Sequence, residues 1–432
     1  MENQYLSAEY KRSRKAYVTQ CTLEHLIGLL VADAFLAKLL SHLGLNDALI
    51  GVISSFTSIA FVFQLLVIYI AKSKLSTKKA VIISDGLSQL FFMLLYLIPF
   101  FPVSAEIKKY LVIVCVIIGY LGKYVILTLY FKWANTYVNP KNRGVFSANK
   151  EVISLICGII FVSVMGYFVD KFESIGNIRG GFIFIASAML IINILNFISL
   201  LMIKDEDAAV HETSRIAFRD VLKHIYKNKL YFRYILSIIP SAIAGGSIVG
   251  FIGIYKTKDL MLSILTIQFI NISADFARII FSKPFGRFSD KYGFARGIEL
   301  SNILILLCFI TIIFTTPATR YFIIIYTVLY SISSAGSYQN SFNIGYTLLP
   351  PEYMTQAGAI KSVVSGLCSF GSAVLAGKIL NYIQMEGNMI FGIHIYGQQF
   401  LAIIASIFKI TAILIFHFTV IKPIEQLKIK SK

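Results

Sequence analysis

The chain has 432 residues, of which 57% are hydrophobic and only 14% are charged, and its mean hydropathy is +0.74. Soluble domains carry about 25% charged residues, so this composition excludes a secreted, disordered or soluble-enzyme class and predicts an all-α membrane protein. The formal charge of +18 leaves two interpretations open. The basic residues either bind nucleic acid or set the topology of membrane spans.

The polar N-terminal segment is the first feature along the chain, and residues 1–17 lack the short apolar stretch and cleavage site of a signal peptide. The five cysteines lie singly in apolar runs, which predicts neither a disulfide framework nor a metal site. The sequence also lacks a Walker A motif, a zinc-ligand set and a nucleophile elbow. We therefore expect no cofactor and no enzymatic activity.

Twelve apolar segments reach the length of about 20 residues that a membrane-spanning helix needs. The widest gap, 204–230, predicts a cytoplasmic linker, and helical spacing of apolar and basic residues over 218–234 predicts an amphipathic helix on the membrane surface. The predicted domains are an N-terminal six-helix bundle, 1–203, and a C-terminal six-helix bundle, 231–432. The predicted spans are 18–41, 48–71, 80–103, 109–134, 148–170, 180–203, 231–255, 260–282, 294–316, 320–345, 357–380 and 396–420.

The basic residues are unevenly distributed between the two sides of the predicted spans. Most of the 40 Lys and Arg residues lie in loops on one side of the predicted spans. The positive-inside rule makes that side cytoplasmic and places both termini there. Because the basic loops are short and flank the membrane, the pattern argues against nucleic acid as a partner.

The two halves of the chain are similar at an offset of 211 residues. The aligned residues lie at the same place in a loop and helix that follow span 4 or span 10. This similarity predicts two parallel repeats related by an axis along the membrane normal. The offset aligns Pro140 with Pro351, Lys150 with Lys361, Ser154 with Ser365, Cys157 with Cys368 and Gly166 with Gly377.

Two loops carry a resemblance to a known family. The sequence GRFSDKYGFAR at 286–296 resembles the GxxxD(R/K)xG(R/K) loop of the major facilitator superfamily, and the segment 140–150 is similar to a loop of many bacterial members. The first-half loop, 71–79, keeps only the basic residues of the signature. The resemblance implies two pseudo-symmetric six-helix bundles in a bacterial plasma membrane. It also implies a cytoplasmic gate formed by Arg143, Gly286, Asp290, Lys291, Gly293 and Arg296.

The glycines and the aspartate of this loop have a direct physical interpretation. Gly286 and Gly293 are expected to allow a tight turn between two helices. Asp290 is expected to pair with a cation or to cap a helix in one conformation of a transporter. The alternative is a basic loop with a solvated carboxylate.

Ionisable residues inside the predicted spans are candidate functional residues, because charges are costly in lipid without a partner or water. Glu24 and Asp33 are nine residues apart and so lie on opposite faces of a straight first span. We predict a transport role for Asp33, and pairing of Glu24 with a basic loop residue. Lys123, near the middle of span 4, needs an anion, either Asp33 or a solute group, and Tyr120 offers a hydroxyl beside it.

Spans 8 and 10 carry further polar residues. One face of span 8 is polar at intervals of three or four, and Asp275 and Arg278 form either a structural pair or a proton-exchanging pair. Span 10 holds many hydroxyls and amides, which predicts a cavity lining or a helix contact. In the family, spans 1, 4, 7 and 10 surround the central cavity. The candidates on these two spans are Gln268, Asn271, Asp275, Arg278, Ser334, Tyr338 and Asn340.

These residues together predict a secondary transporter that moves a small anionic, zwitterionic or hydroxyl-rich solute by alternating access, as a monomer in the lipid bilayer. The expected coupling ion is H⁺, with Na⁺ as the alternative, and Asp33, Glu24 and Asp275 are the carboxylates that could titrate. An exporter of drugs or lipid-like molecules is a second reading, although span 5 lacks the Gly-Pro pair of drug/proton antiporters. A transport-inactive sensor or scaffold is the third.

Overall fold

A computed structural model describes residues 7–66, 76–125, 127, 130, 133, 136–138, 143–204, 218–390 and 392–430 of the chain. The described residues are almost entirely helical, apart from one antiparallel hairpin of β1 (Met389–Ile390) and β2 (Ile393–His394). Parts of the predicted linker and of two predicted loops lie outside the described residues. These parts are 205–217, 71–75 and 140–142.

Within the described residues, nine helices are long and apolar enough to cross a membrane. The chain is therefore a multi-pass membrane protein, while the count of twelve spans and the cytoplasmic termini stay predictions. The nine are Asp47–Gln64, Thr77–Phe100, Asn149–Ser174, Ile178–Met202, Lys229–Asp259, Ile264–Tyr292, Phe294–Ile313, Ala357–Met385 and Gly397–Leu427.

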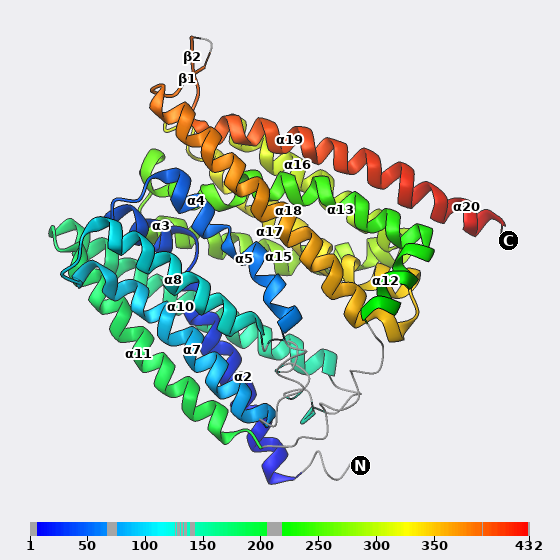
Figure 1. The fold of residues 1–432 in the computed structure, drawn as a ribbon, viewed down its shortest axis with the longest axis horizontal. Helices are drawn as coiled ribbons and strands as arrows, with labels where there is room; N and C mark the ends of the chain where they lie inside the picture. Colours follow the sequence, from blue (N-terminus) through cyan, green and yellow to red (C-terminus); the bar gives the residue numbers. More distant parts are fainter. Residues whose placement is uncertain are drawn as a thin grey trace. The chain divides into compact units, whose positions relative to one another are not determined.

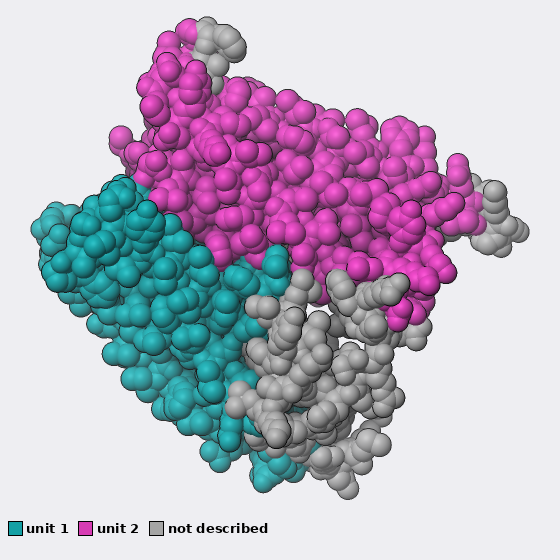
Figure 2. All heavy atoms as spheres, viewed as in Figure 1, with its two compact units in different colours: residues 1–45, 60–215, 263–268 teal, residues 46–59, 216–262, 269–432 magenta. Residues whose placement is uncertain are grey.

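The chain forms two compact units, which Figure 2 shows in teal and magenta. Unit 1 comprises residues 1–45, 60–215 and 263–268, and unit 2 comprises 46–59, 216–262 and 269–432. Each unit therefore includes a short segment from the other half of the sequence. The predicted domain limits at 203 and 231 stay predictions.

Unit 1 is a bundle in which α2 packs on α10 and α11, and α7 packs on α8 and α11 (Figure 1). Three of its helices begin at a polar cap, because the side chains of Ser7, Ser76 and Asn177 each accept a hydrogen bond from a backbone N–H three residues later. Its helices are α2 (Ala8–Leu30), α3 (Asp33–His42), η1 (Phe61–Leu66), α7 (Thr77–Leu97), η2 (Ile98–Phe100), α8 (Ala105–Val125), α10 (Arg143–Ser174) and α11 (Ile178–Met202).

The first predicted span is interrupted. Helix α2 ends at Leu30 and α3 starts at Asp33, which has a φ of 44°. The hydroxyl of Tyr96 on α7 donates a hydrogen bond of 2.5 Å to the carbonyl of Leu30, which the break leaves without a helical partner. The prediction of one continuous helix over 18–41 is therefore wrong, and the opposite-face relation of Glu24 and Asp33, which was derived for a straight helix, no longer follows.

Unit 2 packs α13 against α18 and α19, and α16 against α17 and α19 (Figure 1). Its core includes the buried side chains of Phe251, Phe309, Leu380 and Leu401. Helix α5 (Phe56–Ala60) ends at the boundary with unit 1, and α15 begins in unit 1. The other helices are α4 (Asp47–Ser54), α12 (Phe218–Lys227), α13 (Lys229–Ile248), η5 (Val249–Phe251), α14 (Ile252–Ile254), η6 (Tyr255–Asp259), α15 (Ile264–Tyr292), α16 (Phe294–Ile313), α17 (Phe322–Leu348), α18 (Pro351–Met385), α19 (Gly397–Phe416), η7 (His417–Ile421) and α20 (Lys422–Lys430).

Helix α15 extends through most of the predicted gate loop. Gly286 and Asp290 lie inside this helix, so the prediction that two glycines form the turn is wrong. Gly293 alone joins α15 to α16, with a φ of 97° and a ψ of 153°. This conformation is open essentially only to glycine, because a Cβ would clash with the backbone.

The predicted amphipathic helix is present as α12, which ends at Lys227 before Asn228 caps α13. Its Val221 and Ile225 side chains are buried against unit 2, while Leu222 and Tyr226 are exposed. The helix is therefore attached to unit 2 by one part of its apolar face and leaves another part exposed.

Candidate functional site

The candidate site in unit 1 is an ion pair between two helices. The Nζ atom of Lys123 on α8 lies 3.2 Å from Oε1 of Glu24 on α2. The two side chains are 27% and 22% exposed, so the pair is neither sealed in the core nor fully at the surface. A Cβ at Gly28, one turn after Glu24, would lie 3.9 Å from Nζ, which is an ordinary van der Waals distance. The pair is therefore partly exposed and not crowded from this side.

The partner of Glu24 corrects one prediction. We expected Glu24 to pair with a basic loop residue, but its cation is the helical Lys123. The cation thus comes from within a helix and not from a loop, because the tertiary packing brings Lys123 of α8 to the level of Glu24 on α2. The transport role predicted for Asp33 stays a prediction.

A second contact orients the Glu24 carboxylate. Gln20, one turn earlier on α2, donates from Nε2 to Oε2 of Glu24 at 3.3 Å. Gln20 in turn accepts a hydrogen bond from the hydroxyl of Tyr130, which lies 3.2 Å from the sulfur of Cys21. Each oxygen of Glu24 thus has its own partner, and the carboxylate is held facing Lys123.

Aromatic side chains line the α8 side of the pair. Tyr120 packs edge-on against Phe92 of α7 with ring centroids 5.1 Å apart, and its ring is tilted against Tyr124 at 6.1 Å. Tyr124 packs edge-on against Phe61 at 5.0 Å. The site therefore combines a cation and a carboxylate with a cluster of packed aromatic rings, of which Tyr120 is buried and Tyr124 half-buried.

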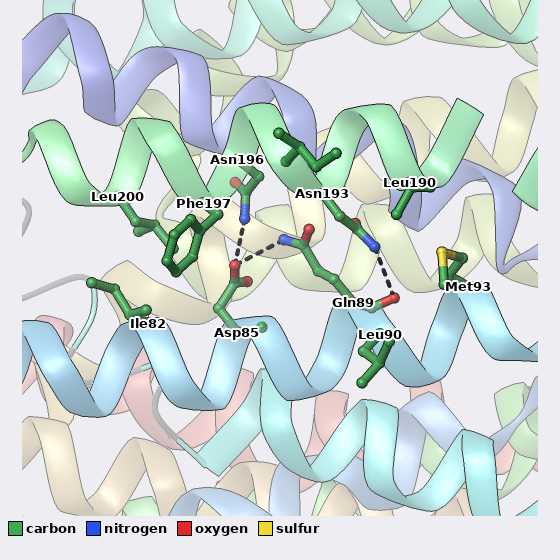
Figure 3. A pocket seen from close by; sticks show the side chains of 12 residues that line it. Ile82, Asp85, Gln89, Leu90, Met93, Leu190, Asn193, Asn196, Phe197 and Leu200 are labelled. Atoms are coloured by element: carbon green, nitrogen blue, oxygen red, sulfur yellow. Dashed lines mark hydrogen bonds between the residues drawn. The ribbon is translucent and has the colours of Figure 1, made fainter. Parts of the chain in front are cut away.

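Asp85 on α7 is a residue that the sequence analysis missed. It is 8% exposed, and its Oδ2 accepts hydrogen bonds from Gln89 Nε2 at 2.8 Å and from Asn196 Nδ2 of α11 at 2.5 Å (Figure 3). It also interacts electrostatically with Glu24 and Lys123. The signal was present, because Asp85 lies within predicted span 3, as its sixth residue, and an ionisable residue inside a span is costly in lipid without a partner or water.

Two other buried charges in unit 2 were also unassigned. Lys409 on α19 is buried and donates to Ser241 Oγ at 2.6 Å and to Asn302 Oδ1 at 3.1 Å. Asp47 at the start of α4 pairs with Lys258 at 2.8 Å. Both lie at positions where an ionisable residue interrupts or borders an apolar run, so the same rule would have identified them.

The predicted polar face of span 8 lies on α15. Gln268 is buried, and Asn271, Asp275 and Arg278 are half-buried. A half-buried stripe is compatible with either a helix contact or a cavity wall. The pairing of Asp275 with Arg278 stays a prediction.

The candidates of predicted span 10 lie on α17. Ser334 donates to the carbonyl of Tyr330 on its own helix at 2.8 Å. Asn340 is buried against α16, since a Cβ at Gly297 would lie 2.3 Å from its Nδ2. These geometries support the helix-contact interpretation for Asn340. The side chains of Tyr338 and Arg143 lie outside the described part of the chain.

The predicted gate residues that the structure describes do not all meet at one place. Arg296 pairs with Glu299 on α16 and with Glu425 on α20, each at 2.8 Å. Asp290 is exposed, and Lys291 Nζ lies 5.0 Å from the ring centre of the neighbouring Tyr292. Arg296 thus links α16 to α20 in unit 2, through carboxylates that the family signature does not include.

Potential metal ligands are scattered among the described residues. No group of three or more His, Cys, Asp or Glu side chains there could hold a metal ion. The five cysteines are unpaired thiols. The chemistry of the candidate site therefore rests on the charged, amide and aromatic side chains.

Bundles of membrane helices with charged pairs between them define the class of membrane transporters. The sequence profile of the Major Facilitator Superfamily matches residues 26–376, and the chain belongs to this family. Members of the family are transporters and not enzymes. Among curated proteins, no sequence match was found.

Proteins of known structure have the same fold. The nucleoside transporter NupG matches with a TM-score of 0.69 and 15% identity, covering 96% of this chain and 99% of that chain. A D-xylose-proton symporter matches with a TM-score of 0.70 and 13% identity, covering 95% of this chain and 97% of that chain. A bacterial homolog of the human lysosomal transporter Spinster matches with a TM-score of 0.65 and 12% identity, covering 96% of this chain and 97% of that chain. At these identities the likeness shows the transporter fold alone.

Proposed function

We propose that the protein is a secondary active transporter that moves a small polar solute across the bacterial plasma membrane by alternating access, coupled to protons. The Glu24–Lys123 pair carries this proposal, because a partly exposed ion pair between membrane helices needs a functional reason. The similarity to a nucleoside transporter and a D-xylose-proton symporter supports a solute of this kind. Twelve spans with cytoplasmic termini belong to the same proposal.

The chemistry of the site favours certain solutes. The ammonium of Lys123 offers up to three donors, and the carboxylate of Glu24 accepts from hydroxyl or ammonium groups. The half-buried ring of Tyr124 is the aromatic surface next to Lys123 on which a cyclic solute would stack. This combination suits a hydroxyl-rich, zwitterionic or anionic solute better than an apolar cation.

The pair also provides a route to proton coupling. A solute anion that binds Lys123 removes the cation from Glu24. A carboxylate without a cation is costly in a membrane bundle, so Glu24 then takes up a proton. Solute binding and proton binding are coupled in this way, and Asp33 and Asp275 are the further carboxylates to which the same logic applies.

Uptake into proteoliposomes tests the proposal. Labelled nucleosides, sugars, amino acids and organic acids are offered with and without an imposed pH gradient. We expect saturable uptake of one class that the gradient accelerates, and loss of at least about tenfold in affinity in Lys123→Ala, since a charge-assisted contact is worth about 1.5 kcal/mol or more. Lys38→Ala is the matched control, because Lys38 pairs with Glu173 across α3 and α10, away from the Glu24–Lys123 pair.

Several outcomes would overturn the proposal. Absence of flux for every solute class would favour a sensor or scaffold. Flux that ignores the gradient would exclude proton coupling. Selective transport of lipophilic cations would favour a drug exporter, and unchanged affinity in Lys123→Ala would remove the site from the solute pathway.

A further inference from the structure

Asp85 lies where two very different environments meet. On one side of α7 it interacts with Glu24 and Lys123. On the other side it lines a groove of about 350 Å³ between α7 and α11, whose remaining walls are mostly apolar (Figure 3). The wall residues include Ile82, Leu90, Met93, Leu190, Ile194 and Phe197.

The stretch of α7 that carries Asp85 touches α8 directly beside Lys123. Ser84 Oγ donates to the carbonyl of Gly122 at 2.8 Å. A Cβ at Gly122 would lie 2.6 Å from the Ser84 carbonyl oxygen and 3.0 Å from the Ser88 nitrogen. The two helices are therefore in backbone contact on both sides of Asp85. This close approach places the carboxyl of Asp85 near enough to sense the charge of Lys123.

The hydrogen bonds of Asp85 come from neutral amides. Gln89 and Asn196 both donate to Oδ2. The charged groups that face Asp85 are Glu24 from α2 and Lys123 from α8, and α11 contributes the amide of Asn196. The ammonium of Lys123 is within 3.2 Å of Glu24, so the lysine neutralises that carboxylate first.

Charge balance then requires a proton. Glu24, Asp85 and Lys123 carry two carboxyls and one ammonium, so with both carboxyls ionised the cluster has a net negative charge inside the membrane bundle. An unbalanced charge in this environment is strongly disfavoured. One proton shared by the two carboxyls makes the cluster neutral. It belongs on Asp85, because Glu24 already has its cation.

The amide of Asn196 can serve either protonation state of Asp85. Its Oδ1 is buried and has no hydrogen-bond partner among the described residues. An ionised carboxylate can offer no donor, whereas a protonated carboxyl carries one O–H. With the Asn196 amide turned over, its oxygen accepts that O–H, and the choice between the two amide orientations follows from the hydrogen-bond network.

We propose that Asp85 is a proton-binding site of the transporter that competes with Glu24 for Lys123. Asp85 holds the proton while Lys123 pairs with Glu24. When Glu24 is neutralised, by a proton or by an ammonium group of the solute, Lys123 turns to Asp85. The O–H bond of Asp85 then breaks, its proton passes to water, and the new carboxylate pairs with the ammonium. The use of this proton in coupling rests on the proposed function, whereas its presence on Asp85 does not.

Infrared difference spectroscopy of the purified full-length protein tests this proposal without a solute. A protonated carboxyl has a carbonyl stretch that an ionised carboxylate lacks. We expect one buried protonated carboxyl in the native protein at neutral pH, and none in Asp85→Asn. We also expect none in Glu24→Gln, although Asp85 is intact there, because Lys123 is released to pair with it.

Asp47→Asn is the matched control for burial. Asp47 is also buried but is bonded directly to Lys258, so we expect its replacement to leave the band unchanged. Lys123→Met should add a second protonated carboxyl, that of Glu24, because its cation is gone. The double variant with Lys123→Met and Glu24→Gln should then lose this second band. These variants separate the competition for one lysine from a simple effect of burial.

Persistence of the band in Asp85→Asn would overturn the proposal, and so would its persistence in Glu24→Gln. If Asp85→Asn does not fold, Glu24→Gln carries the test, because it leaves Asp85 and its amide partners unchanged. The expected bands combined with no solute flux in proteoliposomes would reject the proposed function but keep the proton site. Solute flux without the carbonyl band would keep the proposed function and reject the proton site.

Discussion

Asp47 and Lys258 form an ion pair between positions 211 residues apart, the same offset at which the two halves of the sequence are similar. Lys258 Nζ lies 2.8 and 3.0 Å from the two carboxylate oxygens, and Gln384 of α18 donates to Oδ2 at 2.6 Å. The pair and the Gln384 contact therefore tie α4 to η6 and α18 within unit 2.

Removal of the cation should destabilise this contact. Lys258→Met leaves Asp47, which is 2% exposed, with only the amide of Gln384. We expect the free energy of unfolding to fall by about 1–3 kcal/mol, less than for a fully buried pair because the Lys258 side chain is 55% exposed. Thermal unfolding in detergent measures the loss. Lys109→Met, which breaks an exposed pair with Glu106, should change stability by less than about 0.5 kcal/mol, and equal effects would contradict the prediction.

The two glycines of the predicted gate loop should respond in opposite ways to alanine. Gly293→Ala should lower stability by about 1–3 kcal/mol, because its φ of 97° is strained for any residue with a Cβ. Gly286→Ala should raise stability by about 0.5–1 kcal/mol, since Gly286 is inside α15 and a Cβ there has no neighbour within 4 Å. Denaturation curves of both variants give the comparison, and a loss in Gly286→Ala would show that this region is not helical.

Glu24 and Lys123 should be energetically coupled. Each of Glu24→Gln and Lys123→Met removes one of the two opposite charges and leaves the other behind, whereas the double variant leaves neither charge. A double-mutant cycle on unfolding should therefore give an interaction energy between about 0.5 and 3 kcal/mol. Additive effects of the two substitutions would mean that the 3.2 Å contact contributes nothing to stability.

Asp170 should stabilise the start of α15. Its carboxylate accepts hydrogen bonds from the backbone N–H groups of Ile264 at 3.1 Å and Leu265 at 2.9 Å, at the positive end of that helix. Asp170→Ala should lower the free energy of unfolding by about 1–3 kcal/mol. Asp170→Asn keeps one acceptor and should lose less. Hydrogen exchange of these two amides provides a local measurement, and unaltered protection in Asp170→Ala would argue against the contact.

Long apolar runs allowed most membrane helices to be predicted to within a few residues. The predicted span 180–203 corresponds to α11, and 294–316 corresponds to α16. The interruption of the first span at Leu30 was missed, because it depends on a hydrogen bond from Tyr96 of another helix. The extension of α15 past Gly286 was missed because the glycine was taken as a turn residue, although glycine is tolerated inside a helix.

The sequence by itself determined the class of protein and identified Lys123 as a candidate charged residue. Apolar length, basic loops and the gate signature led to a transporter of the major facilitator superfamily, and lipid cost singled out Lys123. The tertiary structure alone decided that Lys123 pairs with Glu24 and that Asp85 lies behind the pair. Helical periodicity fixes which residues share one face of a helix, but it contains no information on how far neighbouring helices are rotated and shifted against each other. Those rotations and shifts determine which charges meet.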